Sequence, residues 1–184
     1  MKKLPKLLQD TATAVPEVAA EQLAESNALD VQVPHQEQDN WCWCAVTVGF
    51  NTFFDSAFSL AQCETAAEVL GIKDACIRPG DDDVNTLFEL DVALSKFGRL
   101  AHMSGVLKFE EIQKQIDAGR PVGVHVFFVD SGVSHFTVIR GYRSGPVSTL
   151  AIDDPLYDES EWSYQEFVDS YKGSGAWKHS YLTQ

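Results

Sequence analysis

Residues 35–45 read His-Gln-Glu-Gln-Asp-Asn-Trp-Cys-Trp-Cys-Ala, and an almost wholly apolar run follows them to Phe54. Asp39 and Asn40 are good N-cap residues, because their side-chain oxygens accept the first free N–H groups of a helix. With Asn40 as the cap, Cys42 is the second helical residue, where the positive end of the helix dipole stabilises a thiolate. A helix that is apolar on nearly every side is a buried helix. The stretch therefore predicts a reactive cysteine at the tip of a buried helix.

The composition is that of one globular domain. The chain has 184 residues, of which 45% are hydrophobic and 22% charged, and this length is enough for a full core. The formal net charge of −13 argues against binding to nucleic acid or to an anionic membrane surface, because both need a basic surface. The sequence contains no apolar run of about 18 residues, so we expect no membrane-spanning helix.

The first ten residues carry the lysines of an export signal without its apolar centre, which Gln9 and Asp10 interrupt. We therefore expect a cytoplasmic protein by default, with secretion by a specialised system as the alternative. Four cysteines without an export signal favour free thiols. Cys63 and Cys76 are expected to be core or loop thiols that pair only in an oxidising compartment.

Residues 1–30 are polar and alanine-rich and contain no aromatic residue, which predicts an N-terminal arm, either flexible or propeptide-like, ahead of a domain over residues 31–184. Helical spacing and stop signals predict helices, and β-branched and aromatic runs predict strands. The expected helices cover residues 41–54, 60–70, 84–97, 109–118 and 164–171, and the expected strands cover residues 122–128, 135–142, 148–152 and 177–182. Helices first and an antiparallel sheet after them predict an α+β fold.

The residues needed for cysteine catalysis are present in this pattern. A cysteine nucleophile needs a base, a group that orients the base, and donors that hold the oxyanion. Cys42 is the candidate nucleophile, and His135 begins a strand just after a turn, at the rim of a sheet. Asp154 ends the next strand, so a hairpin brings it near His135. Gln36 lies on the loop ahead of the helix, where its amide can point back towards Cys42 as an oxyanion donor.

Alternatives remain open for two of these roles. Asp153 points to the opposite face of the strand from its neighbour and is the other candidate for the orienting acid. Gln38 is the other candidate for the oxyanion amide. Cys44 points about 200° away from Cys42 around the helix, so we expect it to be a buried thiol and not part of a metal site. We expect His125, inside a strand, to be a core residue.

Several short motifs resemble papain-like cysteine peptidases. Gln36 followed after five residues by Cys42-Trp43 resembles their Gln-x5-Cys-Trp signature. The strand His-Phe-Thr-Val-Ile-Arg-Gly-Tyr from His135 is similar to their His-Ala-Val-x-x-x-Gly-Tyr strand. Three further motifs resemble the bacterial branch of staphopain-like, type III effector and bacteriocin-leader peptidases, over roughly residues 31–183. They are Val33-Pro34-His35-Gln36, Trp41-Cys42-Trp43-Cys44-Ala45 and Asp154-Pro155.

The resemblance implies a papain-like α+β fold, with a central buried helix packed on an antiparallel sheet. It implies a bacterial cysteine peptidase that hydrolyses peptide bonds of a peptide or protein substrate without a cofactor or metal. In that reaction Cys42 is the nucleophile, His135 the general base and acid, Asp154 the residue that orients it, and Gln36 the oxyanion donor. Two alternatives are another acyl transfer by the same triad, transglutaminase-like or amidase, and an inactive papain-like binding module. Cys44 departs from the pattern, which has a small residue at that position.

Overall fold

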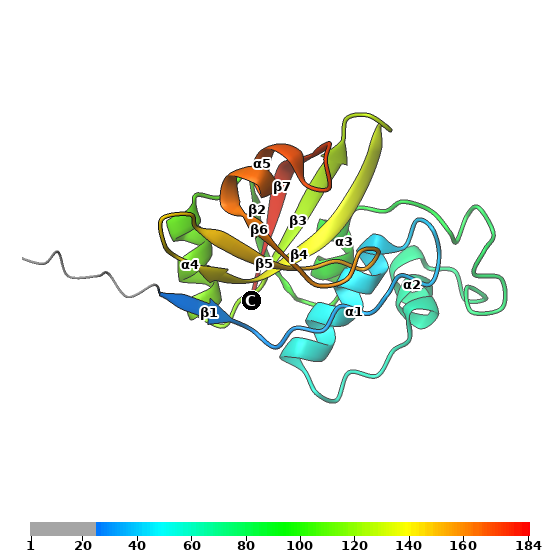
Figure 1. The fold of residues 1–184 in the computed structure, drawn as a ribbon. Coiled ribbons are helices and arrows are strands. Elements are labelled where there is room, and N and C mark those ends of the chain that lie inside the picture. The colour runs from blue at the N-terminus through cyan, green and yellow to red at the C-terminus, as the bar shows by residue number, and fades with distance from the viewer. Residues whose placement is uncertain (1–24) are drawn as a thin grey trace, which may run out of the picture.

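A buried helix packed against an antiparallel sheet is the centre of the fold (Figure 1). The computed structural model describes residues 25–184. The helices are α1 (Cys42–Phe54), α2 (Gln62–Leu70), α3 (Leu90–Lys96), α4 (Phe109–Asp117) and α5 (Tyr164–Ser170). The strands are β1 (Ser26–Ala28), β2 (Leu100–Ser104), β3 (Val122–Phe128), β4 (Val133–Arg143), β5 (Thr149–Asp153), β6 (Ser160–Ser163) and β7 (Gly175–Thr183). No helix within residues 25–184 has the length and apolar character needed to cross a membrane.

The sheet has the strand order β2-β7-β3-β4-β5-β6, and every pairing is antiparallel. β1 pairs with the far end of β4, at Gly141–Arg143. Helices α1 and α3 cover one face of the sheet, and α4 and α5 pack against the opposite face (Figure 1). The predicted α+β fold is therefore confirmed. Residues 1–24 of the predicted N-terminal arm lie outside the described residues. Strand β1 lies in the rest of that arm, residues 25–30.

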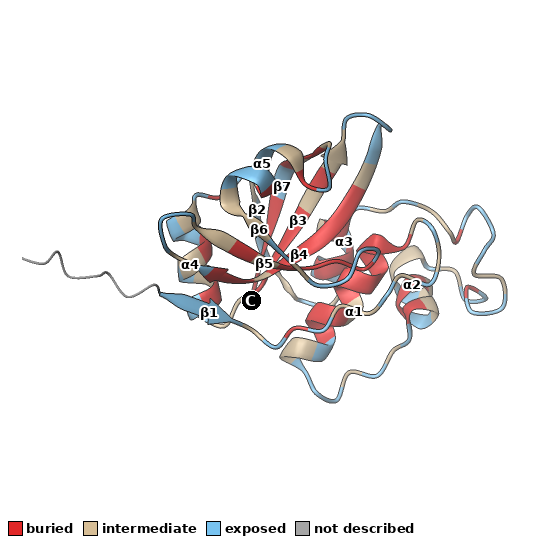
Figure 2. Cartoon of the chain, viewed as in Figure 1, coloured by how far each residue is buried: buried red, intermediate tan, exposed pale blue. Residues whose placement is uncertain are grey.

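Helix α1 is buried along most of its length, as its composition predicts: nine of its 13 residues are buried (Figure 2). Its polar residues form hydrogen bonds inside the core, because Thr47 donates to the Trp43 carbonyl and Asn51 to the Thr47 carbonyl. The close approach to the sheet depends on Gly123 of β3. A Cβ atom there would lie 3.3–3.4 Å from side chains of α1, α3 and β7, which is tighter than ordinary packing.

The start of α1 differs from the prediction. Trp41 occupies the N-cap position and makes no side-chain capping bond, so Cys42 is the first helical residue and not the second. The Asn40 side chain, predicted to cap, donates to the Asn85 carbonyl instead, while the Asn85 side chain accepts the Asn40 N–H. The prediction of an Asn40 cap is wrong because a partner distant in sequence competes for the same side chain.

The predicted helix over residues 84–97 is also too long, because α3 begins only at Leu90. In the segment before it, the carbonyls of Val84 and Thr86 accept the indole N–H groups of Trp41 and Trp43, both at 2.9 Å. Backbone groups used in this way are unavailable to a helix, so tertiary contacts override the local helical spacing. The strands β1, β2 and β6 were not expected from the sequence.

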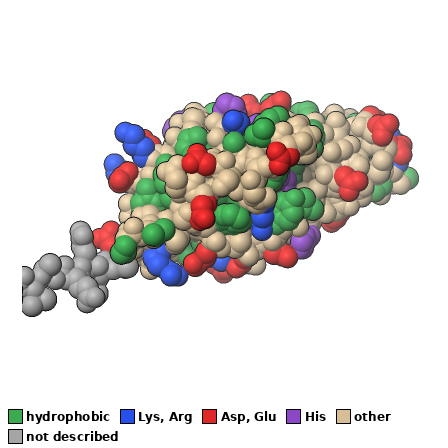
Figure 3. All heavy atoms as spheres, turned by 45° about the horizontal axis from the view of Figure 1, so that its top comes forward, with side chains coloured by type: hydrophobic (Ala, Val, Ile, Leu, Met, Phe, Trp, Pro, Cys, Tyr) green, Lys and Arg blue, Asp and Glu red, His purple; other side chains and the backbone are tan. Residues whose placement is uncertain are grey.

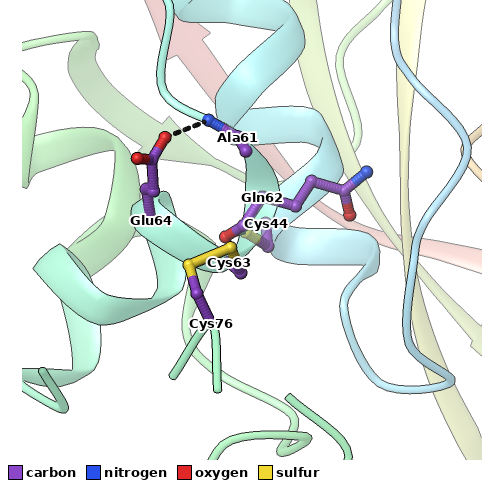
Figure 4. The surroundings of a disulfide bond; sticks show 6 residues. All are labelled: Cys44, Ala61, Gln62, Cys63, Glu64 and Cys76. Atoms are coloured by element: carbon purple, nitrogen blue, oxygen red, sulfur yellow. Dashed lines mark hydrogen bonds between the residues drawn. A yellow bond between two sulfur atoms is a disulfide. The ribbon is translucent and has the colours of Figure 1, made fainter. Parts of the chain in front are cut away.

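Two of the four cysteines form a disulfide, which corrects the expectation of free thiols (Figure 4). Cys63, in the first turn of α2, is bonded to Cys76, with their Cα atoms 4.8 Å apart. Helix α2 ends at Gly71 in the left-handed conformation (φ 75°), and the following turns bring Cys76 back to the helix. Sequence spacing alone does not reveal this approach. Cys42 and Cys44 are the free cysteines.

The surface in Figure 3 carries acidic side chains scattered across the visible face, with Lys and Arg side chains among them. This distribution agrees with the formal net charge of −13. It spreads the negative charge over several elements of the fold.

Removing the disulfide should destabilise the domain. The double substitution Cys63→Ser and Cys76→Ser is expected to lower the free energy of unfolding by about 2–4 kcal/mol, because the unfolded chain loses a covalent constraint. Urea unfolding with and without a phosphine reductant measures this. The reductant should bring the wild type to the stability of the double variant and leave the variant unchanged. Equal unfolding midpoints for the wild type in both conditions would contradict the prediction.

Candidate active site

The N-terminus of α1 and the start of β4 meet at a cleft of about 270 Å³. Three of the four predicted site residues line this cleft: Gln36, Cys42 and His135. The fourth, Asp154, contacts the His135 ring. The structure thus brings together residues from the loop before α1, from α1 itself, from the start of β4 and from just after the end of β5. The other lining residues are Asp39, Asn40, Leu87, Phe128, Ser131, Val133, Ser134, Leu156 and Tyr157.

His135 and Asp154 form a buried pair. The ring Nε2 of His135 lies 2.9 and 3.0 Å from the two carboxylate oxygens of Asp154, and the residues are only 5% and 2% exposed. The register that pairs Val138 with Asp153 ends β5 beside the start of β4, so the next residue reaches the histidine. Since Nε2 is occupied by Asp154, Nδ1 is the ring nitrogen that remains for Cys42.

Further donors fix the Asp154 carboxylate. Its Oδ1 accepts the N–H groups of Leu156 and Tyr157 at 2.8 and 3.0 Å, and its Oδ2 accepts the Tyr171 hydroxyl at 2.8 Å. Burial alone would raise the pKa of Asp154, but the bonds from His135, Leu156 and Tyr171 outweigh it and lower that pKa. The carboxylate is therefore held ionised in a dry environment.

The His135 imidazolium is favoured by its surroundings. Burial lowers the pKa of His135, yet hydrogen bonds and charge interactions with Asp154 and Cys42 outweigh burial and raise it to about 9. The rings of Phe128 and Tyr157 pack against the imidazole, with centroids 6.3 and 6.0 Å away. At neutral pH the charged ring is thus held between a carboxylate and a cysteine.

The two free cysteines have different surroundings. Cys42 lines the cleft, whereas Cys44 is fully buried and donates its S–H to the Gln62 carbonyl, 3.1 Å away. Burial, followed by the negative charge of Glu37, raises the pKa of the Cys44 thiol. Cys44 therefore stays protonated and packed, as predicted for a buried thiol.

Gln36 lines the cleft and anchors its own loop. Its side-chain nitrogen donates to the carbonyls of Gln38 and Asp39, at 2.9 and 2.8 Å. Its Oε1 is buried and has no hydrogen-bond partner among residues 25–184. Gln38, the alternative amide, takes part only through its backbone carbonyl and does not line the cleft.

Asp153, the alternative acid, has a different partner from Asp154. Its Oδ2 accepts the Val33 N–H at 2.8 Å, and burial, only partly opposed by that bond, raises its pKa. The two neighbouring carboxylates therefore point in different directions, Asp154 to the His135 ring and Asp153 to the backbone of Val33, as alternation along a strand requires. Sequence reasoning did not identify Tyr171, because the only local signal was a tyrosine at the end of a predicted helix.

Apolar side chains form much of the cleft rim. Leu87, Val133, Leu156 and Tyr157 line the cleft and remain 43–49% exposed. Large apolar side chains left this exposed around a cleft are typical of a binding surface. Outside the cleft, His125 is half-buried in β3 and its Nε2 lies 2.9 Å from the Ser134 hydroxyl. Within residues 25–184, no group of three or more His, Cys, Asp or Glu side chains is placed to hold a metal ion.

Two solved structures share this fold. A C39-like peptidase from Bacillus anthracis aligns with a TM-score of 0.55 and 17% identity, over 87% of this chain and 98% of that one. A double-glycine-motif protease from an AMS/PCAT transporter, in complex with the leader peptide, aligns with a TM-score of 0.51 and 16% identity. That alignment covers 85% of this chain and 94% of the protease. A search of curated protein sequences found no match.

The likeness to these two structures confirms the predicted papain-like α+β fold. At the level of sequence, residues 29–180 match the Peptidase_C39 like family. The chain therefore belongs to that family, and the resemblance seen in its motifs is confirmed.

The buried His135–Asp154 pair predicts a pH-dependent contribution to stability. A histidine pKa raised from about 6.5 to about 9 stabilises the folded state fully below about pH 6.5 and loses this effect as pH rises through about 9. The lowered pKa of Asp154 adds stability that is present above about pH 4 and is lost in more acidic solution. The pair thus contributes most between about pH 4 and pH 6.5.

The substitution His135→Asn should therefore cost about 3–5 kcal/mol near pH 6, because it leaves a buried carboxylate without its counter-charge. The difference from wild type should shrink towards pH 9. Thermal unfolding followed by circular dichroism across this range measures it, with His102→Asn on the exposed strand β2 as the matched control. A difference that stays constant from pH 5 to pH 9 would refute the assignment of the charged pair.

Proposed function

We propose that the chain is a cysteine peptidase that hydrolyses peptide bonds through Cys42, His135 and Asp154, with Gln36 as an oxyanion donor. One observation carries the proposal: a free cysteine at the tip of a buried helix and a buried His–Asp pair open onto the same cleft. Membership of the Peptidase_C39 like family supports it. A charged histidine between a cysteine and a carboxylate is the arrangement that activates a thiol.

The reaction follows from this arrangement. In the resting pair the Cys42 proton has passed to His135, and the thiolate Sγ attacks the carbonyl carbon of the scissile bond to form a tetrahedral oxyanion. The imidazolium then gives its proton to the leaving amine as the C–N bond breaks, which leaves a thioester on Cys42. Water, deprotonated by the same imidazole, attacks the thioester, releases the acid and restores the Cys42 thiolate beside the His135 imidazolium. Asp154 keeps the imidazole in one orientation and stabilises its charged form.

The oxyanion would be stabilised by the backbone N–H of Cys42 and the side-chain amide of Gln36. The first N–H groups of a helix have no acceptor inside it, so that of Cys42 remains available. The Gln36 amide donates to two neutral carbonyls in this structure. A negatively charged oxygen is a stronger acceptor than either, so we propose that one N–H turns from its carbonyl to the oxyanion.

The substrate class that best fits the cleft is an extended peptide. The exposed apolar rim suits peptide side chains, because such surfaces gain from being covered. One structural neighbour is described in complex with a leader peptide, which supports a peptide substrate here as well. Transfer of the acyl group to an amine and an inactive binding module are the competing proposals, and product analysis separates them from hydrolysis.

The site can be tested with a complex peptide mixture, such as a tryptic digest of a cell extract, incubated with the protein. Mass spectrometry should find new peptide ends, and Cys42→Ala should reduce their formation by at least about a thousandfold, since the covalent route is lost. Cys44→Ala is the matched control and should retain the activity. Peptides joined to added amines in place of cleaved peptides would favour acyl transfer. Cleavage that persists in Cys42→Ala would refute the nucleophile.

We also propose that the protein acts in an oxidising compartment and not in the cytoplasm expected by default. The support is the Cys63–Cys76 disulfide, since such bonds persist where thiols are not kept reduced. Acid quenching of producing cells and alkylation of free thiols, followed by mass spectrometry, tests this. Alkylated Cys63 and Cys76 in the mature protein would contradict it.

A further inference from the structure

Gln62, the first residue of α2, is only 3% exposed, and its side chain reaches the loop that carries Gln36. Its amide nitrogen donates to the His35 carbonyl at 2.6 Å, and its amide oxygen accepts the Glu37 N–H at 3.1 Å. One buried amide thus binds the backbone on both sides of Gln36. In Figure 4 this amide points away from the disulfide that follows it in the helix.

A third bond fixes the same short segment from the sheet side. The Gln36 N–H donates to the Pro155 carbonyl at 2.9 Å, next to Asp154. The backbone at Gln36 is therefore held between α2 and the segment that carries the orienting acid. With its backbone fixed at three successive residues, the Gln36 side chain has few ways to leave the cleft.

Helix α2 is itself attached to the neighbouring elements. The Gln62 carbonyl accepts the Cys44 S–H of α1, and Cys63 is bonded to Cys76 (Figure 4). Because α2 is held by these bonds, the side chain of Gln62 fixes the loop at the cleft relative to the helix. Only a side chain with a donor and an acceptor side by side can satisfy both a carbonyl and an N–H in this way.

We propose that Gln62 is a positioning residue for the oxyanion site, which acts by fixing the backbone around Gln36. The inference rests on the proposed function, because it assumes that Gln36 stabilises an oxyanion. It implies that Gln62 affects steps that form an oxyanion and leaves the nucleophilicity of Cys42 unchanged.

Two reactions of Cys42 separate these effects. Hydrolysis of p-nitrophenyl acetate passes through a tetrahedral oxyanion, whereas alkylation by iodoacetamide is a displacement at carbon that forms none. In Gln62→Leu, kcat for the ester should fall about tenfold, since small displacements of a catalytic group are costly. The alkylation rate of Cys42, measured by peptide mass mapping, should stay within about twofold of wild type.

The double variant tests whether Gln62 acts through Gln36. In the Gln36→Ala background, Gln62→Leu should change kcat by less than about twofold, because its target is already gone. Thr183→Val is the matched control: Thr183 is buried and donates to the Pro121 carbonyl at 2.7 Å, so it also loses a buried bond to backbone. It should reduce thermal stability and leave kcat unchanged.

Gln62→Glu provides a second variant and a distinct readout. The ionised carboxylate accepts from Glu37 N–H but cannot donate to the His35 carbonyl, whereas the protonated acid can do both. The ratio of its kcat to that of wild type should therefore rise as pH falls from about 8 to about 5. A merely destabilising substitution would not recover in this way.

The outcomes separate this inference from the function on which it rests. Ester hydrolysis that depends on Cys42 but is unaffected by Gln62→Leu overturns the role of Gln62 alone. Equal loss of hydrolysis and alkylation, or effects of Gln62→Leu and Gln36→Ala that multiply, also overturns it. Absence of any Cys42-dependent hydrolysis by the wild type overturns the proposed function and this inference with it.

Discussion

Burial of the N-terminus of α1 is the constraint on which the rest of the structure depends. The first N–H groups of any helix lack internal acceptors, and here no side chain caps the helix. The protein surrounds this end with two loops that are bonded to each other and to the two tryptophans beside Cys42. Cys42 thereby lines the cleft while the apolar body of the helix stays buried. The arrangement of loops around Cys42 is thus a consequence of burying a helix end.

The surroundings of Asp154 likewise follow from the burial of a polar group. A carboxylate buried as deeply as Asp154 is tolerated only when its oxygens are bonded and its charge is balanced. Two backbone N–H groups, a tyrosine hydroxyl and the His135 ring meet these needs. The donors come from the turn after β5 and from the residue that follows α5, so the fold of the second half of the chain is required to keep one charge in place. The histidine gains a fixed orientation from the same arrangement.

Local signals predicted most elements of the fold, because apolar spacing, glycine stops and β-rich runs act over a few residues. The strand over residues 122–128 was predicted with its exact bounds, and Gly71 ends α2 as expected. The candidate site could be assembled because Gln36, Cys42, His135 and Asp154 each lie within a recognisable motif. The failures have one physical origin. Each of them depends on contacts between residues distant in sequence, which no local pattern reports. Such contacts are the Asn40–Asn85 bonds, the tryptophan bonds to the loop before α3, the Cys63–Cys76 bond, and the bonds of Asp154 and Gln62.

A cystine and the proposed catalytic thiol of Cys42 lie in one small domain, and the two have opposing chemical requirements. Oxidants convert a nucleophilic thiolate to sulfenic acid, whereas a thiol reagent that reduces the sulfenic acid back to the thiol also attacks disulfides. Cys76 is exposed and Cys42 is only 2% exposed, so a reagent reaches the cystine more readily than the Cys42 thiol. Preparations handled with different reductants are therefore different covalent species, and only an intermediate redox potential keeps both sulfur centres in the forms seen here.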